Sequence, residues 1–203
     1  MSVLPGLAPV WDYRLFAAYL RLNFRLRGRE VSGLENLPET GAVIVAANHV
    51  SLVDPPFIGS TMELVRHTRY LAKGELFRLP VAGWVLRRWG VIPVDRARGD
   101  VGAVRRAVSV LRQEGCILVF PEGTRSRGGV PGRPKSGVSL LARESGACVV
   151  PARVWDTDRW LGPGKMRLRF GRPFRYDEDG SREGDRRFAE RVMREIFSLQ
   201  AGA

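Results

Sequence analysis

The sequence predicts a single α/β domain with a largely parallel central sheet flanked by helices, plus an N-terminal amphipathic helix. At 203 residues, with 44% hydrophobic and 27% charged side chains, the chain is long enough to bury one sizeable core. From residue 41 onward, short apolar runs alternate with helix-like stretches, which is typical of layered proteins with parallel strands. The chain shows neither a fixed-period repeat nor a long linker. We therefore assign residues 1–30 to the helix and residues 31–203 to the domain.

Six apolar runs are expected to form strands because they are short and rich in β-branched and other apolar residues. They are GAVIVAA (41–47), RYLA (69–72), GVIPV (90–94), CILVF (116–120), CVVPARV (148–154) and MRLRF (166–170). Helices are expected over residues 55–65, 76–88, 101–114, 136–145 and 182–199. The last of these mixes arginines with acidic residues, which predicts a solvated charged face.

The N-terminal helix is expected over residues 11–29. Most of its surface is apolar, whereas Arg14, Arg21 and Arg25 project within about 40° of one another at helical spacing. One interpretation is a helix docked on the domain core with a solvated arginine stripe. The other is a membrane-interfacial helix whose arginines meet lipid phosphates. Periodicity shows that a face is buried but not in what, so both interpretations stay open.

The charge balance predicts an anionic partner. The chain has 33 Lys and Arg against 21 Asp and Glu, a net charge of +12, and most of the basic residues are arginine, which favours bidentate anion binding. Nucleic acid, an anionic membrane surface and a phosphorylated substrate all fit this charge. The tryptophans beside arginines in GWVLRRWG (83–90) favour a membrane interface, with packing of a helix as the alternative.

No segment predicts secretion or a membrane span. The first ten residues lack the charged start of a signal peptide. The longest apolar runs, of about six or seven residues, fall far below the ~20 needed to cross a bilayer. Cys116 and Cys148 do not make a secreted disulfide framework. We therefore expect membrane contact to be peripheral and on the cytoplasmic face.

Polar residues follow four of the predicted strands. They are Asn48 and His49 after the first, Lys73 after the second, Asp95 and Arg96 after the third, and Glu122 to Arg125 after the fourth. In open α/β sheets, ligands gather beyond the carboxyl ends of the strands. These side chains are therefore expected to share one site, although Arg96 could instead form only a surface turn with Asp95.

The stretch NHVSLVDPP (48–56) places a histidine five residues before an aspartate. A histidine acts as a general base when a carboxylate fixes its tautomer and stabilises the imidazolium. If residues 50–53 form a tight turn, Asp54 can fold back onto His49. The alternative is that Asp54 caps a helix with Pro55 at its first position, while His49 only bonds backbone.

Other catalytic centres lack support. Ser51 could be a nucleophile, but bonding to the backbone of the turn is the simpler role. A serine hydrolase triad would also need a second histidine that is paired with a carboxylate. His67 does not supply this, since we expect His67 to lack a nearby carboxylate. No H-E-x-x-H or cysteine pair predicts a metal, and no cofactor is expected. No glycine-rich phosphate loop of known type occurs, so phosphate would be held by side chains.

The segment FPEGTRS (120–126) is suited to phosphate. Gly123 permits close backbone approach, while Thr124 and Arg125 offer a hydroxyl and a fork of donors. The alternative for Glu122 is an ion pair with Arg125 that only fixes the turn.

Together, four motifs resemble those of the glycerolipid acyltransferases, and most closely the bacterial 1-acylglycerol-3-phosphate O-acyltransferases, also called lysophosphatidic acid acyltransferases. They are N-H-x-S-x-x-D (48–54), K-x-E-L-F (73–77), G-V-I-P-V-D-R (90–96) and F-P-E-G-T-R-S (120–126). Their order and spacing match that family, and the resemblance runs from about residue 30 to residue 175. Many relatives carry longer hydrophobic N-terminal segments than this chain, so integral membrane attachment is not expected.

The resemblance implies transfer of a fatty acyl group from acyl-CoA or acyl carrier protein to the free hydroxyl of 1-acylglycerol-3-phosphate, which gives phosphatidic acid in phospholipid biosynthesis. His49 would take the hydroxyl proton, and Asp54 would orient and stabilise the imidazolium. The contacts that it implies for the glycerol phosphate of the acceptor are Arg96, Glu122, Gly123, Thr124 and Arg125, with Lys73 as an additional anion contact.

Two alternatives stay open. The acceptor could be another lysolipid or a glycolipid. A function of a different class is a basic nucleic-acid-binding module without catalysis. That module would need exposed aromatics interleaved with basic residues along a groove, or a recognisable motif such as a helix-turn-helix, and the sequence shows neither.

Overall fold

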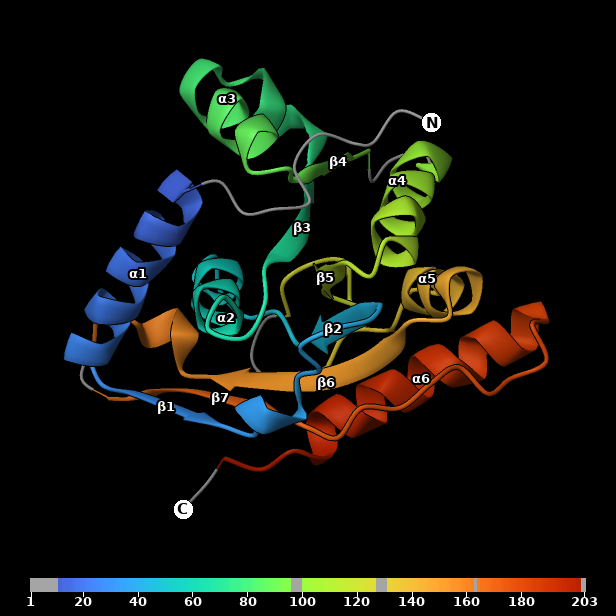
Figure 1. Ribbon diagram of the computed structural model, residues 1–203. Helices are drawn as coiled ribbons and strands as arrows, with labels where there is room; N and C mark the ends of the chain where they lie inside the picture. The colour runs from blue at the N-terminus through green and yellow to red at the C-terminus, as the bar shows by residue number, and fades with distance from the viewer. Residues whose placement is uncertain (1–10, 96–99, 127–130, 163, 202–203) are drawn as a thin grey trace.

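Seven strands form one sheet with helices on both faces (Figure 1). The computed structural model describes residues 11–95, 100–126, 131–162 and 164–201. The strands are β1 Arg29–Ser32, β2 Val43–Ala47, β3 Thr68–Lys73, β4 Ile92–Val94, β5 Cys116–Val119, β6 Cys148–Trp155 and β7 Met166–Phe170. The α-helices are α1 Trp11–Leu26, α2 Asp54–Met62, α3 Pro80–Arg88, α4 Val101–Arg112, α5 Gly137–Ser145 and α6 Arg182–Ser198, and the 3-10 turns are η1 Leu34–Asn36, η2 Gly74–Arg78 and η3 Thr157–Arg159. The predicted fold class is confirmed.

The sheet is largely parallel, as predicted. Its order is β1-β7-β6-β2-β5-β3-β4, and among the described strands only the β6–β7 pair is antiparallel. In the centre, Val45 of β2 lies opposite Leu118 of β5 and Val150 of β6. The strands β2 to β6 therefore end at one common edge of the sheet, and the polar motifs follow them there.

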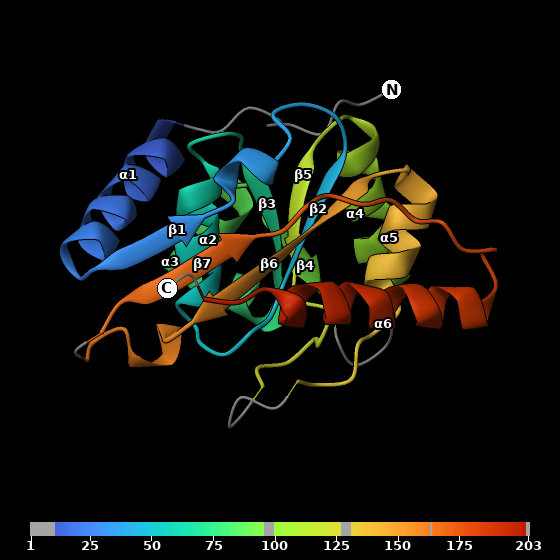
Figure 2. The same cartoon turned by 90° about the horizontal axis from the view of Figure 1, so that it is seen from below.

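Two apolar layers hold the sheet between its helices (Figure 2). On one face, Phe57 of α2 belongs to the same buried cluster as Val45 of β2. On the other face, Leu111 of α4 and Phe188 of α6 cluster with Ile44. Successive residues of a strand point to opposite faces. A central strand covered on both faces must therefore be apolar throughout, which explains the run GAVIVAA.

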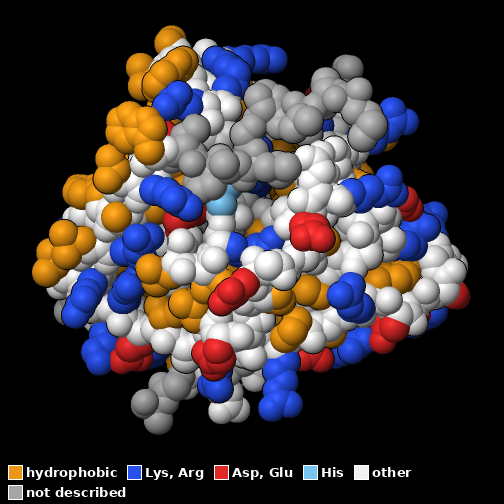
Figure 3. Space-filling view, in the orientation of Figure 1, with side chains coloured by type: hydrophobic (Ala, Val, Ile, Leu, Met, Phe, Trp, Pro, Cys, Tyr) orange, Lys and Arg blue, Asp and Glu red, His pale blue; other side chains and the backbone are white. Residues whose placement is uncertain are grey.

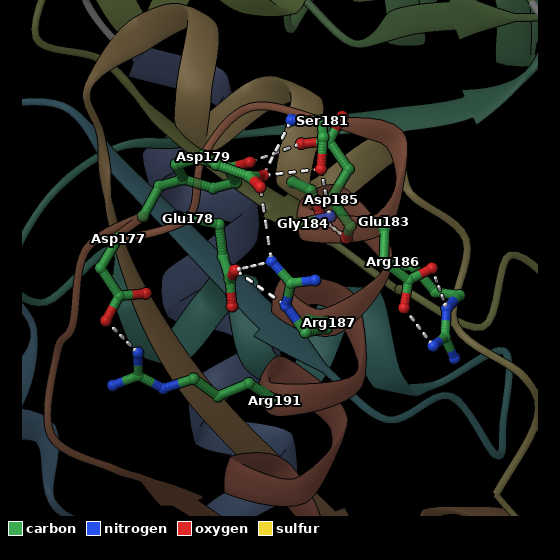
Figure 4. Close-up of polar contacts among 12 residues, drawn as sticks. Asp177, Glu178, Asp179, Ser181, Glu183, Gly184, Asp185, Arg186, Arg187 and Arg191 are labelled. Carbon is green, nitrogen blue, oxygen red and sulfur yellow. Dashed lines mark hydrogen bonds and ion pairs between the residues drawn. The ribbon is translucent and has the colours of Figure 1, made fainter.

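Helix α6 has an apolar face and an ion-paired face. Its buried apolar residues include Phe188, Val192 and Ile196. On the exposed side, Arg187 pairs with Glu178 at 2.7 Å and Arg191 pairs with Asp177 at 2.6 Å (Figure 4). Exposed ion pairs are screened by water and add little net stability, so the buried face accounts for the docking of this helix. The predicted charged face is confirmed.

Two elements differ from the prediction. The short strand β1 was not expected, because its four residues, REVS, carry a single strongly apolar side chain. The helix expected over 76–88 is instead a 3-10 turn, η2, followed by α3. The break lies at Leu79, which has an extended backbone (ψ 129°). Proline disfavours helical geometry in the residue before it, so Pro80 can begin a helix but not continue one.

Helix α1 is docked on the domain and also carries an exposed apolar row. Tyr13, Ala17 and Phe24 are buried against the core, and Arg21 donates to the carbonyl of Ser60 in α2 at 3.0 Å. The exposed row comprises Trp11, Leu15, Tyr19, Leu22 and Leu26. At 100° per residue, this row spans about 80° and lies nearly opposite the buried face. The helix therefore has a second apolar surface that the domain leaves uncovered.

Within the described part of the chain, no helix combines the length and the apolar character that crossing a bilayer requires.

Candidate active site

The site begins where β2 ends. His49 follows directly, and its backbone is held from both sides by the segment after β5. Its amide N–H donates to Glu122 Oε1 at 3.1 Å, and its carbonyl accepts from the amide of Ser126 at 2.8 Å. His49 and Glu122 are 73 residues apart in the sequence, so the ends of two strands are joined at one histidine.

His49 and Asp54 form the predicted dyad. His49 Nδ1 lies 2.8 Å from Asp54 Oδ2, and the Asp54 side chain is fully buried. The same oxygen accepts from the backbone N–H groups of Val50 and Ser51 at 2.7 and 2.8 Å. A carboxylate can only accept hydrogen bonds, so Nδ1 carries the proton and Nε2 is the basic nitrogen.

The helix-capping alternative is not what the structure shows. The Asp54 oxygen that bonds backbone accepts from Val50 and Ser51, which precede it, and no side-chain cap bond occurs at the start of α2. Asp54 instead closes the turn that brings His49 back. The Ser51 hydroxyl accepts from the amide of Val53 at 3.2 Å, which is the backbone role expected for it.

The His49 ring stacks on Phe120, with centroids 4.2 Å apart and planes inclined by 23°. One cavity of about 330 Å³, which we term the dyad cavity, is lined by His49, Phe120 and Lys135 together with residues of α4 and α5. A second, of about 310 Å³, lies between α1, α2, α3 and the sheet, and we term it the apolar cavity. Leu71, Leu118 and Phe120 line both, so the ring that stacks on His49 belongs to the wall that the two cavities share.

Aromatic side chains form one wall of the apolar cavity. Tyr13 and Tyr70 share a hydrogen bond between hydroxyls 2.5 Å apart, and Trp89 packs edge-on against Tyr13 at 5.3 Å. Burial raises the pKa of Tyr13 to about 12 and raises the pKa of Tyr70 as well. Both phenols therefore stay neutral at physiological pH, and the cavity offers an uncharged wall.

The loop after β5 presents a hydroxyl and a cation beside the histidine. Thr124 and Arg125 are exposed, and with Val50 and Ser126 they line a third cavity of about 400 Å³. Within the described residues, neither the Thr124 hydroxyl nor the Arg125 guanidinium bonds another group. These groups are suited to a phosphate placed next to His49.

Glu122 faces inward. Its side chain accepts from the amides of His49 at 3.1 Å and Gly132 at 2.8 Å, and the residue is 4% exposed. It therefore joins the loop around residue 132 to the histidine, and the ion pair with Arg125 does not form. Gly123 has φ +71°, and a Cβ there would meet the side chain of Lys135, so glycine is required at this turn.

One of the predicted anion contacts, Lys73, lies away from the cavities around the histidine. Lys73 is exposed, pairs with Glu75 at 3.2 Å and lines none of the three cavities. Arg96 lies outside the described residues. No cluster of three possible metal ligands occurs among the described side chains.

Comparison with known proteins identifies the family of this chain. Residues 28–155 match the acyltransferase family. The chain belongs to that family. The crystal structure of the 1-acyl-sn-glycerophosphate (LPA) acyltransferase PlsC from Thermotoga maritima is similar, with a TM-score of 0.73 and 31% identity over 95% of this chain and 80% of that one. The resemblance predicted from the four motifs is confirmed.

Two curated relatives extend the comparison. The chloroplastic 1-acyl-sn-glycerol-3-phosphate acyltransferase LPAT1 from Arabidopsis thaliana is 34% identical over 66% of this chain and 38% of its own length. A lyso-ornithine lipid O-acyltransferase from Pseudomonas aeruginosa is 32% identical over 71% of this chain and 51% of its own. The match thus spans about two fifths to half of the length of these two acyltransferases.

Three contacts went unpredicted. The Asn48 side chain donates to the carbonyl of Val154 at 3.0 Å and accepts from its amide at 2.8 Å. The Thr157 hydroxyl donates to the second oxygen of Asp54. The expectation that His67 lacks a carboxylate was wrong, because Glu63, four residues earlier, lies 3.0 Å from it.

We predict that Glu122→Gln lowers stability rather than acceptor affinity. The amide side chain keeps only one acceptor oxygen, so one of the two backbone N–H groups loses its partner, at a cost of about 1–3 kcal/mol. Urea unfolding measures this, with the more exposed Glu144→Gln as a control expected to stay within about 0.5 kcal/mol. If the Glu122→Gln protein kept the stability of the wild type and only its KM for the acceptor rose, Glu122 would not have the structural role of joining the loop to His49.

Proposed function

We propose that the protein transfers a fatty acyl group from a thioester, acyl-CoA or acyl carrier protein, to the free hydroxyl of 1-acylglycerol-3-phosphate, which yields phosphatidic acid. The observation that carries this proposal is the His49–Asp54 dyad, in which Nε2 of His49 is the basic nitrogen. His49 lines the dyad cavity, and Arg125 lies on the neighbouring loop. Family membership, and the relatives named for this reaction, support it.

The geometry supports direct transfer. His49 Nε2 would accept the proton of the acceptor hydroxyl as its oxygen attacks the thioester carbonyl carbon. The tetrahedral intermediate would then collapse with cleavage of the carbon–sulfur bond, and the imidazolium would return the proton to the departing thiolate. Asp54 would stabilise the imidazolium through Nδ1. The nucleophile is the acceptor itself, so no acyl-enzyme is needed.

Anion binding would rest mainly on Thr124 and Arg125. Both belong to the loop whose Ser126 bonds the His49 carbonyl, so a phosphate bound there would be held at a fixed distance from the base. Lys73 and Arg96 would add positive charge to the approach, and Gly123 would allow the loop to come close. The contribution proposed for Glu122 is to brace this loop.

The apolar cavity would hold the acyl chain of the donor. Its walls come from α1, α2, α3 and the sheet, and it shares Phe120 with the dyad cavity. A chain lying in it would therefore place its thioester end near the ring that stacks on His49. Apolar clefts of a few hundred Å³ with convergent polar groups at one end are typical of such ligand sites.

The proposed membrane contact is peripheral, with an anionic bilayer on the cytoplasmic face. The exposed apolar row of α1 lies on the same side of the molecule as an exposed apolar surface formed by η2 and α3 (Figure 3). The side chains of that surface are Leu76 of η2, Leu79 between the two elements, and Val81 and Trp84 of α3. Basic side chains flank this surface, as the arginines of α1 do. Leu52 and Leu76, which line the apolar cavity, are themselves exposed. The opening of the cavity would thus face the lipid.

A second acceptor class deserves the same test. The lyso-ornithine lipid relative is about as similar to this chain as the Arabidopsis one, although its named acceptor carries an ornithine headgroup. An acceptor panel distinguishes the two, because the exposed Arg125 favours a phosphate over a zwitterionic headgroup.

The central prediction concerns thiol release. Wild-type protein with acyl-CoA or acyl carrier protein should release thiol fastest with 1-acylglycerol-3-phosphate among lysophospholipids, lyso-ornithine lipid and glycolipid acceptors. His49→Ala should lower the rate by about 10²- to 10⁴-fold or more, since the general base is lost. His67→Gln, which alters the only other histidine, should retain activity. A folded His49→Ala protein with near-normal turnover would refute the proposal.

Arg125→Ala should raise the KM for 1-acylglycerol-3-phosphate while leaving the KM for the thioester nearly unchanged. Loss of one charge-assisted bond corresponds to a change on the order of 10- to 100-fold. Steady-state kinetics with each substrate varied in turn measures it. Arg105→Ala, on α4, is the control, and an unchanged acceptor KM in the Arg125 variant would exclude this phosphate contact.

The membrane contact predicts a loss of vesicle binding on removing the apolar row. Leu15→Ser combined with Leu22→Ser should weaken sedimentation with anionic vesicles by at least about tenfold, since each leucine loses apolar burial. Val101→Ser, which alters an exposed side chain of α4, should bind as wild type does. Tight, salt-dependent binding to DNA with no binding to vesicles would instead support a nucleic-acid-binding module.

A further inference from the structure

We propose that Thr157 is a positioning residue for the dyad, whose hydroxyl fixes Asp54 in the orientation that supports His49. This inference rests on the proposed role of His49 as the base. The Thr157 hydroxyl lies 2.5 Å from Asp54 Oδ1, and both residues are fully buried. A hydroxyl facing a carboxylate is the donor, so this bond runs from Thr157 to Asp54.

The two oxygens of Asp54 have different partners. Oδ2 receives His49 Nδ1 and the amides of Val50 and Ser51, whereas Thr157 is the described donor to Oδ1. Donors on both oxygens prevent the carboxylate from rotating about its Cβ–Cγ bond. A buried carboxylate also needs compensating donors to remain charged. Thr157 therefore supplies orientation and charge stabilisation at once.

The fold brings Thr157 to this position through the parallel pairing of β2 and β6. Ala47 lies opposite Ala152 in the register, and just beyond it the Asn48 side chain makes two bonds to the backbone of Val154. Asp156 then adopts a left-handed conformation with φ 60°, which turns the chain so that Thr157 begins η3. The end of β6 is thus locked to the same turn that carries the dyad.

A purely structural threonine and a positioning threonine predict different titrations. With His49 neutral, the His49–Asp54 pair carries one negative charge, and gaining a proton neutralises it. Removing a donor to that charge favours proton uptake by the pair. Thr157→Val should therefore move the titration of His49, and the acid limb of the kcat/KM profile, to higher pH. A residue that only filled space would change stability without moving either.

The kinetic test compares Thr157→Val with Thr157→Ser and Thr61→Val. Thr61 is an equally buried threonine whose hydroxyl donates to the Phe57 carbonyl inside α2, so its loss controls for removing a buried hydroxyl. We expect Thr157→Val to lower kcat on the order of tenfold or more with both KM values within about twofold. The Ser variant should recover most of kcat, and Thr61→Val should keep both kcat and the pH profile.

A second measurement needs no substrate. The chain has only two histidines, so the His49 ring proton signals in an NMR titration are assigned by comparison with His49→Ala. The titration midpoint should rise in Thr157→Val and stay in place in Thr157→Ser and Thr61→Val. If the Val variant fails to fold, Thr157→Cys, which keeps the size but weakens the donor, should show the same upward shift.

The outcomes separate this inference from the proposed function. A wild-type protein that acylates no acceptor defeats the proposed function, while the NMR titration still tests the coupling of Thr157 to His49. An unchanged His49 midpoint and unchanged kcat in folded Thr157→Val, with His49→Ala inactive, would overturn the positioning role alone. An equal loss of kcat in the Ser and Val variants would overturn it as well.

Discussion

The buried carboxylate of Asp54 is the constraint on which the site depends. A fully buried charge is tolerated only when donors surround it, and these come from His49, from the turn after β2 and from Thr157 after β6. The last of them is in place only when β2 and β6 pair in their observed register. The central sheet therefore does more than support the dyad, because its pairing completes the environment that lets the dyad exist.

The sequence could predict those contacts that join residues close together along the chain. His49 and Asp54 are five residues apart, and a single turn brings them together, so the dyad could be written down as one of two alternatives. The choice between support for His49 and helix capping depends on which way the carboxylate points, and composition does not specify that. The parallel sheet was predictable too, since runs such as β2 and β5 are apolar at every position.

What the sequence could not predict depends on register between distant segments. Thr157 and Asn48 act through β6, about 100 residues beyond β2, and no local pattern reveals that pairing. The same rule that drew attention to four strand ends applies to β6, whose carboxyl end carries Thr157. An ion pair between Glu122 and Arg125 was one expectation because the two residues are neighbours in sequence. The fold instead offers Glu122 the amides of His49 and Gly132, which are better partners for a buried acceptor.

The two sides of His49 divide the chemistry of the proposed reaction. Toward Nδ1 the ring meets a closed, fully bonded carboxylate, which fixes the tautomer. Away from it, the protein offers an apolar cavity beneath α1 and a loop carrying Arg125, the two surfaces that a fatty acyl chain and an anionic acceptor require. Helix α1 contributes buried side chains to the cavity wall and an exposed apolar row on its opposite side. In the proposed function, that arrangement lets lipid substrates pass from a bilayer toward the base along an apolar surface rather than through water. Exclusion of water from the site favours direct transfer of the acyl group over hydrolysis of the thioester.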